Sequence, residues 1–220
     1  MKAGAHRAVG AGLVALLLAG CADLGNMSST DSDVGVFGVL LFHAITGIGS
    51  SDDVPRARVA AVPYASLGIR LGSSDESMFV LASKSGDDLL WLGGSRLAVT
   101  TRHGRIIRTA GFARNLSGFQ APPSAAAAHG SAEYLYDFSE LSRYGVVVRC
   151  SQQNAEASPL SVIGVPHDTI HVIEDCSVPQ LDWNFRNEFW RDPSGFVWKS
   201  RQYVAPGMDP FTLEVLRPAD

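Results

Sequence analysis

The sequence predicts a mainly β protein, an antiparallel β-sandwich or open barrel with one N-terminal helix. Runs of β-branched and aromatic residues fill the chain from residue 64 onward. Gly, Ser and Asp interrupt these runs at intervals of roughly ten residues, as is typical of short antiparallel strands joined by turns. Hydrophobic residues make up 46% of the chain, which is enough for a packed core and unlike a disordered composition.

The first twenty residues match a lipoprotein signal peptide. Lys2 and Arg7 precede an uncharged run at residues 8–20, AVGAGLVALLLAG. This run is shorter than the about 20 apolar residues of a membrane-spanning helix and fits a signal-peptide core. It leads into LAGC, the bacterial lipobox pattern of a large aliphatic residue, two small residues and a cysteine. We therefore expect cleavage before Cys21 and lipidation of its thiol; the alternative is an ordinary signal peptide with a chance cysteine.

A lipidated Cys21 would hold the protein at a membrane. Diacylglycerol on the thiol and a third acyl chain on the new amine give stable anchoring, because each buried methylene contributes about 0.8 kcal/mol. Ala22 follows the cysteine where an Asp would retain a lipoprotein in the inner membrane. We therefore expect the outer membrane, with the domain facing the periplasm. Asp23, one position later, keeps inner-membrane retention open as an alternative.

The mature chain is expected to be acidic. Cleavage removes Lys2 and Arg7 from 18 basic residues and none of the 22 acidic ones, so the net charge changes from −4 to −6. A general nucleic-acid binder would show a broad basic excess instead. The charge balance therefore argues against nucleic acid as a partner.

The remaining elements follow one another in a tether, residues 21–33, and a single mainly β domain, residues 34–220. The tether is small and polar. Residues 34–49 are apolar except for His43 and Thr46, with apolar side chains at helical spacing, and predict a mostly buried helix. Strands are expected within 64–72, 77–86, 88–94, 96–104, 105–113, 133–141, 144–150, 167–176, the hairpin 181–206, and 211–216, with an Ala/Pro loop at 120–132.

Two cysteines remain once Cys21 is assigned to lipid. Cys150 and Cys176 each end a strand-like run. An even pair in an oxidising compartment predicts a disulfide, which would stabilise the fold by about 3–4 kcal/mol in the chain-entropy model. Two buried free thiols are the alternative.

The sequence offers no pattern of an enzyme, metal site or cofactor site. His167 and His171 lie four apart in a predicted strand, a separation of about 13 Å and too far for one ion. The neighbours Glu174 and Asp175 point to opposite faces of that strand and make a poor acid–base pair. No nucleophile elbow, phosphate-binding glycine loop or zinc cysteine pattern is present. We therefore expect a noncatalytic protein without cofactor or metal.

Two tryptophans are candidate contacts for a glycan or a protein partner, because sugar-binding surfaces often stack sugar rings on aromatic side chains. They are Trp190 and Trp198, which lie on either side of the predicted turn 192–195. Trp183, Phe185 and Phe189 share one strand face, whereas Trp190 lies on the other. Packing in the core is the alternative for any of the tryptophans.

Arg102, Arg105 and Arg108 belong to a predicted hairpin that turns at His103-Gly104. Gly104 would supply the positive φ that a tight hairpin needs, and Arg102 and Arg105 would flank the turn and be exposed. One interpretation is a solvated hairpin whose charges prevent edge pairing; the other is a small cationic patch for an acidic glycan or a partner. If the patch exists, replacing all three by Gln is expected to weaken binding to an acidic glycan and to cost at most about 1 kcal/mol of stability, as is usual for surface sites. Unchanged glycan binding would leave only the hairpin interpretation.

These segments resemble the YjbF/GfcB family of capsule and exopolysaccharide lipoproteins. HGRIIRTAGFARNL, preceded by LLWLGGSRLAVTT and VPYASLGIRLG, is similar to the family's central region. The C-terminal NEFWRDPSGFVWKSRQYVAPGMDPFTLEVLRP is similar to its closing hairpin. The likeness covers roughly residues 62–218, with a divergent middle at 120–165. The matching positions are Gly104-Arg105, Thr109, Gly111, Asn115-Leu116, Ser200, Gln202 and Pro206.

The resemblance implies a periplasmic, largely β lipoprotein made alongside a polysaccharide export apparatus, with no catalytic residues. We therefore expect a noncatalytic outer-membrane lipoprotein that supports capsule or exopolysaccharide production or export. Its partners would be the membrane, through the anchor, and either the polymer or proteins of the export machinery. A polysaccharide-modifying hydrolase and a structural lipoprotein supporting an outer-membrane barrel are the alternatives.

Overall fold

The computed structural model describes residues 54–121, 130–153 and 155–219. The expected signal peptide, Cys21, the tether and the helix at 34–49 lie outside these ranges. Among the described residues no helix is both long enough and apolar enough to cross a membrane.

The described chain is mainly β, as the sequence predicts. Every expected strand segment is present, and the structure adds a short helix and four short strands, β6 and β9 to β11. The elements are α2 Arg56–Ala61, β1 Ser66–Leu71, β2 Ser77–Ser85, β3 Asp88–Leu92, β4 Ala98–Arg102, β5 Arg105–Ala110, β6 Gly118–Gln120, β7 Ser131–Phe138, β8 Arg143–Gln152, β9 Glu156–Ala157, β10 Leu160–Val162, β11 Val165–His167, β12 Ile170–Val178, β13 Trp183–Arg191, β14 Val197–Gln202 and β15 Phe211–Arg217.

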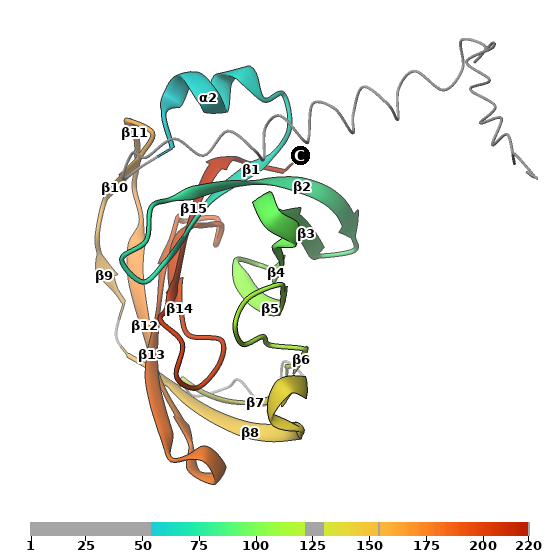
Figure 1. The fold of residues 1–220 in the computed structure, drawn as a ribbon. Helices are drawn as coiled ribbons and strands as arrows, with labels where there is room; N and C mark the ends of the chain where they lie inside the picture. Colours follow the sequence, from blue (N-terminus) through green and yellow to red (C-terminus); the bar gives the residue numbers. More distant parts are fainter. Residues whose placement is uncertain (1–53, 122–129, 154, 220) are drawn as a thin grey trace, which may run out of the picture.

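One antiparallel sheet curls into a nearly closed, barrel-like shape (Figure 1). Its strand order is β5-β4-β3-β2-β1-β15-β14-β13-β12-β8-β7-β6, so the first and last strands of the described chain pair in the middle of the path. The two ends of the path also meet, because the Thr109 N–H of β5 donates to the Leu116 carbonyl just before β6 at 2.9 Å. This closure lets one face of the sheet enclose the core.

Strand alternation decides which side chains enter the core. In β12, Val172, Glu174, Cys176 and Val178 are at most 6% exposed, whereas the residues that alternate with them are half-buried. The same alternation in β13 buries Phe185 and Phe189 and leaves Trp190 on the outer face, as predicted. Each aromatic or aliphatic side chain that is fully buried contributes about 1.5–3 kcal/mol.

The outer face of β1 and β2 is covered by the start of the described chain. Val54, Val59 and Val62, in and beside α2, pack on Met78 and Val80 of β2. This second, smaller cluster lies outside the barrel, so β2 is buried on both faces at Met78–Val80, whereas its last three residues are exposed. The N-terminal end of the described chain is thereby fixed to the sheet.

The hairpin of β4 and β5 packs against β14. His103 and Gly104 have φ of 48° and 77°, so both turn residues adopt the left-handed conformation expected of a tight hairpin. A Cβ on Gly104 would lie 2.4 Å from the Cβ of Val197, so only glycine allows this approach. Gln202 then bonds the edge of β5: its Oε1 accepts from the Ile106 N–H at 2.9 Å and its Nε2 donates to the Gly104 carbonyl at 2.8 Å.

The two cysteines face each other inside the barrel. Cys150 of β8 lies directly opposite Cys176 of β12, and the structure joins them in a disulfide. The bond links two neighbouring strands whose cysteines are 26 residues apart in sequence. It belongs to the packed interior, because both residues are 4% exposed.

Candidate functional site

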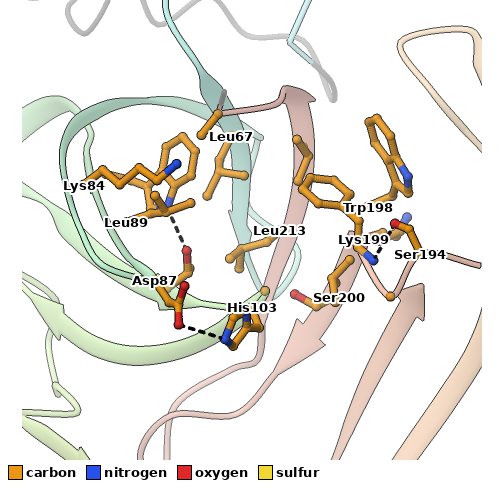
Figure 2. A pocket seen from close by; sticks show the side chains of 18 of the residues that line it. Leu67, Lys84, Asp87, Leu89, His103, Ser194, Trp198, Lys199, Ser200 and Leu213 are labelled. Atoms are coloured by element: carbon orange, nitrogen blue, oxygen red, sulfur yellow. Dashed lines mark hydrogen bonds and ion pairs between the residues drawn. The ribbon is translucent and has the colours of Figure 1, made fainter. Parts of the chain in front are cut away.

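Three hairpin turns surround a pocket of about 430 Å³, here named the mouth pocket (Figure 2). The turns contribute Gly86 and Asp87 between β2 and β3, His103 and Gly104 between β4 and β5, and residues 194–196 between β13 and β14. Apolar side chains from the inner face of β1, β3 and β15 line the pocket wall: Leu67, Leu89, Trp91, Leu213 and Val215. The pocket is therefore continuous with the barrel core and opens at one end of the barrel.

A rigid turn presents the aromatic part of the pocket. Asp192 directly follows β13, and its Oδ1 accepts hydrogen bonds from the N–H groups of Ser194 at 2.9 Å and Phe196 at 3.0 Å. The Ser194 hydroxyl is the largest of the hydrogen-bonding influences that hold the pKa of Asp192 below its ordinary value. Asp192 Oδ2 also accepts the indole N–H of Trp198 at 3.1 Å. One carboxylate thus fixes both the turn and the Trp198 side chain.

Trp198 occupies a bulge in the hairpin. Trp190 pairs with Lys199 and the next residue, Arg191, pairs with Val197, so no residue of β13 lies opposite Trp198. Such a bulge redirects a side chain relative to regular alternation. Trp198 is stacked on His167 at 3.6 Å between ring centres, and the Phe196 ring meets it edge-on at 4.9 Å. The result is an aromatic wall, Phe196 and Trp198, on one side of the mouth pocket.

Charged groups of both signs stand near the opening. His103 Nε2 lies 3.4 Å from Asp87 Oδ2, and Lys199 Nζ lies 2.6 Å from Glu214 Oε1. Lys84 also lines the pocket. Among the described residues that line the pocket, Asp87 is the one carboxylate. The rim therefore offers mixed hydrogen-bonding groups and no strong field of one sign.

The structure corrects the expectation that Arg105 is exposed. Its side chain is 13% exposed, and its Nη2 lies 2.6 Å from both carboxylate oxygens of Glu174, itself 8% exposed. The rings of Tyr134 and Phe189 lie 4.7 and 4.9 Å from the guanidinium carbon. Burial opposes the guanidinium charge, yet Glu174 holds the pKa of Arg105 above its ordinary value. Arg105 is thus part of the interior and is not available to a cationic surface patch.

The other two arginines of the hairpin do not form a cluster with Arg105. Arg102 is partly buried and bonds both oxygens of Asp88, with Nε 2.5 Å from Oδ1. This hydrogen bond is the main reason that the pKa of Asp88 lies below its ordinary value. Arg108 is exposed on the outer face of β5. The three side chains therefore have three different environments.

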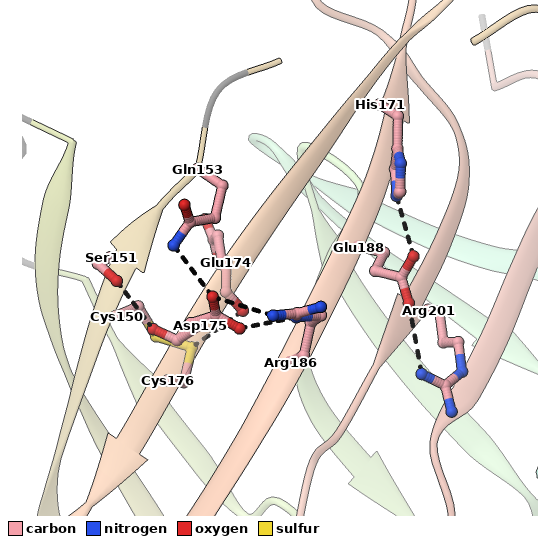
Figure 3. Close-up of polar contacts among 10 residues, drawn as sticks. All are labelled: Cys150, Ser151, Gln153, His171, Glu174, Asp175, Cys176, Arg186, Glu188 and Arg201. Atoms are coloured by element: carbon pink, nitrogen blue, oxygen red, sulfur yellow. Dashed lines mark hydrogen bonds and ion pairs between the residues drawn. A yellow bond between two sulfur atoms is a disulfide. The ribbon is translucent and has the colours of Figure 1, made fainter. Parts of the chain in front are cut away.

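The two candidate tryptophans are also separated by the fold. Trp190 lies on the outer face, where its ring stacks on His171 at 4.3 Å, and it does not line the mouth pocket. Glu188 bridges His171 and Arg201 beside it, with His171 Nε2 2.9 Å from one carboxylate oxygen (Figure 3). Only Trp198 of this pair belongs to the pocket.

The acidic residues and histidines that the sequence offered as site candidates are also separated from one another in the structure. His167 and His171 lie in different strands, β11 and β12, rather than in one. Glu174 faces the interior, whereas Asp175 lies on the outside with Arg186 and Gln153 (Figure 3). Cys150, Glu174 and Cys176 are close enough together to be possible metal ligands. The disulfide and the Arg105 ion pair already use their ligand atoms.

Sequence reasoning missed Phe196, Asp87 and His103 as pocket residues. His103 and Asp87 are turn residues from different hairpins, and nothing in a single sequence indicates that these turns meet. Phe196 gave a weak signal, because it follows directly after the turn glycine Gly195 in a predicted hairpin. At 37% it is among the most exposed large hydrophobic side chains of the described chain.

Comparison with known proteins gives consistent matches over most of the chain. A family model described as group 4 capsule polysaccharide lipoprotein gfcB, YjbF matches residues 40–216. The uncharacterized lipoprotein GfcB of Escherichia coli strain K12 is 26% identical over 218 residues, which cover 94% of this chain and 96% of that protein. The crystal structure of the lipoprotein YmcC from Escherichia coli K12 aligns with a TM-score of 0.64 at 19% identity. That alignment covers 89% of this chain and all of YmcC, and it shows a shared fold.

Proposed function

Because the chain belongs to the YjbF family of group 4 capsule polysaccharide lipoproteins, we propose that it is an outer-membrane lipoprotein supporting capsule or exopolysaccharide export. Acyl chains on Cys21 would anchor it, and the barrel-like domain would face the periplasm. It would act there by contacting the polymer or the export machinery. The observation that carries this proposal is the family match over residues 40–216, which spans the whole described domain but its last residues.

The position of the lipobox supports anchoring. LAGC stands directly after an uncharged run of signal-peptide length. Thirty-two residues separate Cys21 from Val54, where the described domain begins. Fully extended chain reaches about 3.3–3.6 Å per residue, so the domain could work at some distance from the membrane surface.

A noncatalytic role fits the chemistry of the mouth pocket. Glycoside hydrolysis commonly uses two carboxyl groups on either side of the scissile bond. The described pocket residues provide Asp87 alone, and its neighbour His103 lies on an exposed turn. The family description likewise names a lipoprotein and no enzymatic activity.

The test is the amount and location of polysaccharide in a strain that lacks the protein, complemented with wild type or with Cys21→Ser. We expect surface polymer to fall and an intracellular or periplasmic pool to rise in the deletion strain, and wild type to restore export. Cys21→Ser should fail to restore it, because the domain would no longer be held at the membrane. Unchanged polymer amount and location in the deletion strain would contradict the proposal.

A further inference from the structure

The mouth pocket has the size and position of a ligand site. Binding pockets typically measure about 300–1,000 Å³, are lined mostly by apolar and aromatic side chains, and are common in the mouths of β-barrels. The mouth pocket measures about 430 Å³ and opens between three turns at one end of a barrel-like sheet. Its apolar wall comes from regular strands, so the site is preformed.

The aromatic wall is held rigid although it is partly exposed. Phe196 is 37% exposed, and its backbone N–H is bonded to Asp192. Behind it, Trp198 is clamped between His167 and the Asp192 carboxylate. Exposed aromatic surface that is fixed in this way costs hydration free energy without gaining core packing. It is suited to stack on a ligand at low entropic cost.

The polar groups at the rim determine what kind of ligand fits. His103 and Asp87 stand at the β4–β5 and β2–β3 turns, and Lys84 lies on the same side of the pocket as Leu89 (Figure 2). A purely apolar ligand would leave these groups desolvated without partners, which is costly. A strongly anionic ligand would be attracted by Lys84 and repelled by Asp87, so the rim does not favour it. A sugar ring matches, because it has an apolar C–H face and hydroxyl groups that donate and accept hydrogen bonds.

We infer that the mouth pocket binds a sugar unit of the polysaccharide, with its apolar face against Phe196 and Trp198 and its hydroxyls toward Asp87 and His103. This inference rests on the proposed function for the identity of the polymer. It assigns the contact to the polymer rather than to the export machinery. It also separates the two candidate tryptophans, because Trp190 takes no part.

The probe is a set of short oligosaccharides made by partial hydrolysis of the source strain's own capsular polymer. Binding is measured by isothermal titration calorimetry on the full lipoprotein in phospholipid nanodiscs. Phe196→Ala should weaken binding by about 3- to 10-fold, the usual range for loss of one aromatic contact. The matched control is Tyr144→Ala, which removes a 66% exposed aromatic side chain from β8, outside the pocket, and should leave binding unchanged.

A second pair of variants compares two tryptophans of similar setting. Trp198→Ala and Trp190→Ala each remove a half-buried indole that stacks on a histidine. Only Trp198→Ala should weaken oligosaccharide binding, and thermal unfolding of both variants shows whether either has lost its fold. If Trp198→Ala does not fold, Phe196→Ala still decides the question, because that side chain is exposed.

Three results would overturn the inference: no saturable binding by the wild type, equal affinity in Phe196→Ala and Tyr144→Ala, or pocket-dependent binding of a free fatty acid without binding of any oligosaccharide. These results do not bear on export. A deletion strain that loses surface polymer while the purified protein binds no oligosaccharide would refute the sugar site and leave the proposed function standing. Saturable, Phe196-dependent binding with unchanged export would refute the proposed function instead.

Discussion

Replacing Arg105 by Gln should destabilise the domain far more than a surface substitution does. In the native structure Arg105 Nη2 lies 2.6 Å from both oxygens of Glu174, and the two side chains are 13% and 8% exposed. The substitution removes the positive charge and leaves the carboxylate inside the barrel. Losing one partner of a buried ion pair costs about 3–5 kcal/mol. This is a large part of the about 5–15 kcal/mol that stabilises a typical domain.

Arg102 provides a matched control from the same hairpin. Its pair with Asp88 is 42% and 33% exposed, so solvent screens the interaction. Arg102→Gln should therefore cost less than about 1 kcal/mol. The two arginines flank one turn and differ chiefly in burial. The difference in unfolding free energy between Arg105→Gln and Arg102→Gln therefore measures how much burial strengthens the ion pair.

The assay is equilibrium unfolding in guanidinium chloride of wild type, Arg105→Gln, Glu174→Gln and the double variant. Because the two groups contact each other, the double variant should be more stable than additivity predicts, by about 0.5–3 kcal/mol. If Arg105→Gln costs no more than Arg102→Gln, or if the two interior substitutions simply add, the ion pair does not contribute as argued. The expectation from sequence, that all three hairpin arginines are dispensable for stability, would then be restored.

Three further substitutions test other parts of the structure. Gly104→Ala should lower the free energy of unfolding by about 2–4 kcal/mol, because alanine is strained at a positive φ and its Cβ would clash with Val197. Gly86 has a similar φ but no neighbour within 4 Å of an added Cβ, so Gly86→Ala should cost only about 1–2 kcal/mol. Equal costs would argue against the close contact between Gly104 and Val197. Burial raises the pKa of Tyr136 to about 12, so the stability that the protonated phenol contributes is complete below about pH 10 and is lost as pH rises toward 12. In an absorbance titration of tyrosine ionisation, Tyr136→Phe should lack the ionisation that occurs at the highest pH in wild type. An unchanged titration would contradict this. Asp192→Asn should cost about 1 kcal/mol of stability at neutral pH. Because the folded-state pKa of Asp192 is lowered, wild type loses the stability that this carboxylate contributes as pH falls below about 4, and the variant should lose less thermal stability over that range. An equally steep decrease in melting temperature for variant and wild type at acid pH would refute the role of this carboxylate.

The strands could be predicted from local sequence, because the alternation of apolar and polar residues and the turn residues involve positions that are close together in the chain. Strands such as β12 and β13 are nine residues long and alternate clearly. The segments that were missed, β6 and β9 to β11, have two or three residues each, too few for alternation to show. The pairing of β1 with β15, and the meeting of β5 with the chain before β6, depend on contacts distant in sequence. The barrel-like closure was therefore one of two open interpretations.

Side-chain environments were harder to predict than strands. Arg105 follows a turn glycine and has the position of an exposed residue, but its partner Glu174 is 69 residues away. Trp198 and Trp190 have similar sequence surroundings, and a bulge that the sequence does not indicate sends only Trp198 to the pocket. The pairing of Cys150 with Cys176 could be predicted from the sequence, because only two cysteines remained after Cys21 was assigned to lipid.

The bonds from Gln202 to β5 matter for a protein crowded on a surface. Lipid anchors would concentrate many copies in two dimensions, with their domains at similar heights and free to collide. An edge strand with bare N–H and C=O groups would then be a template for joining neighbouring copies. The buried amide of Gln202 occupies the Ile106 N–H and the Gly104 carbonyl from within the same molecule. These two backbone groups of β5 are thus unavailable for strand pairing with a neighbouring copy.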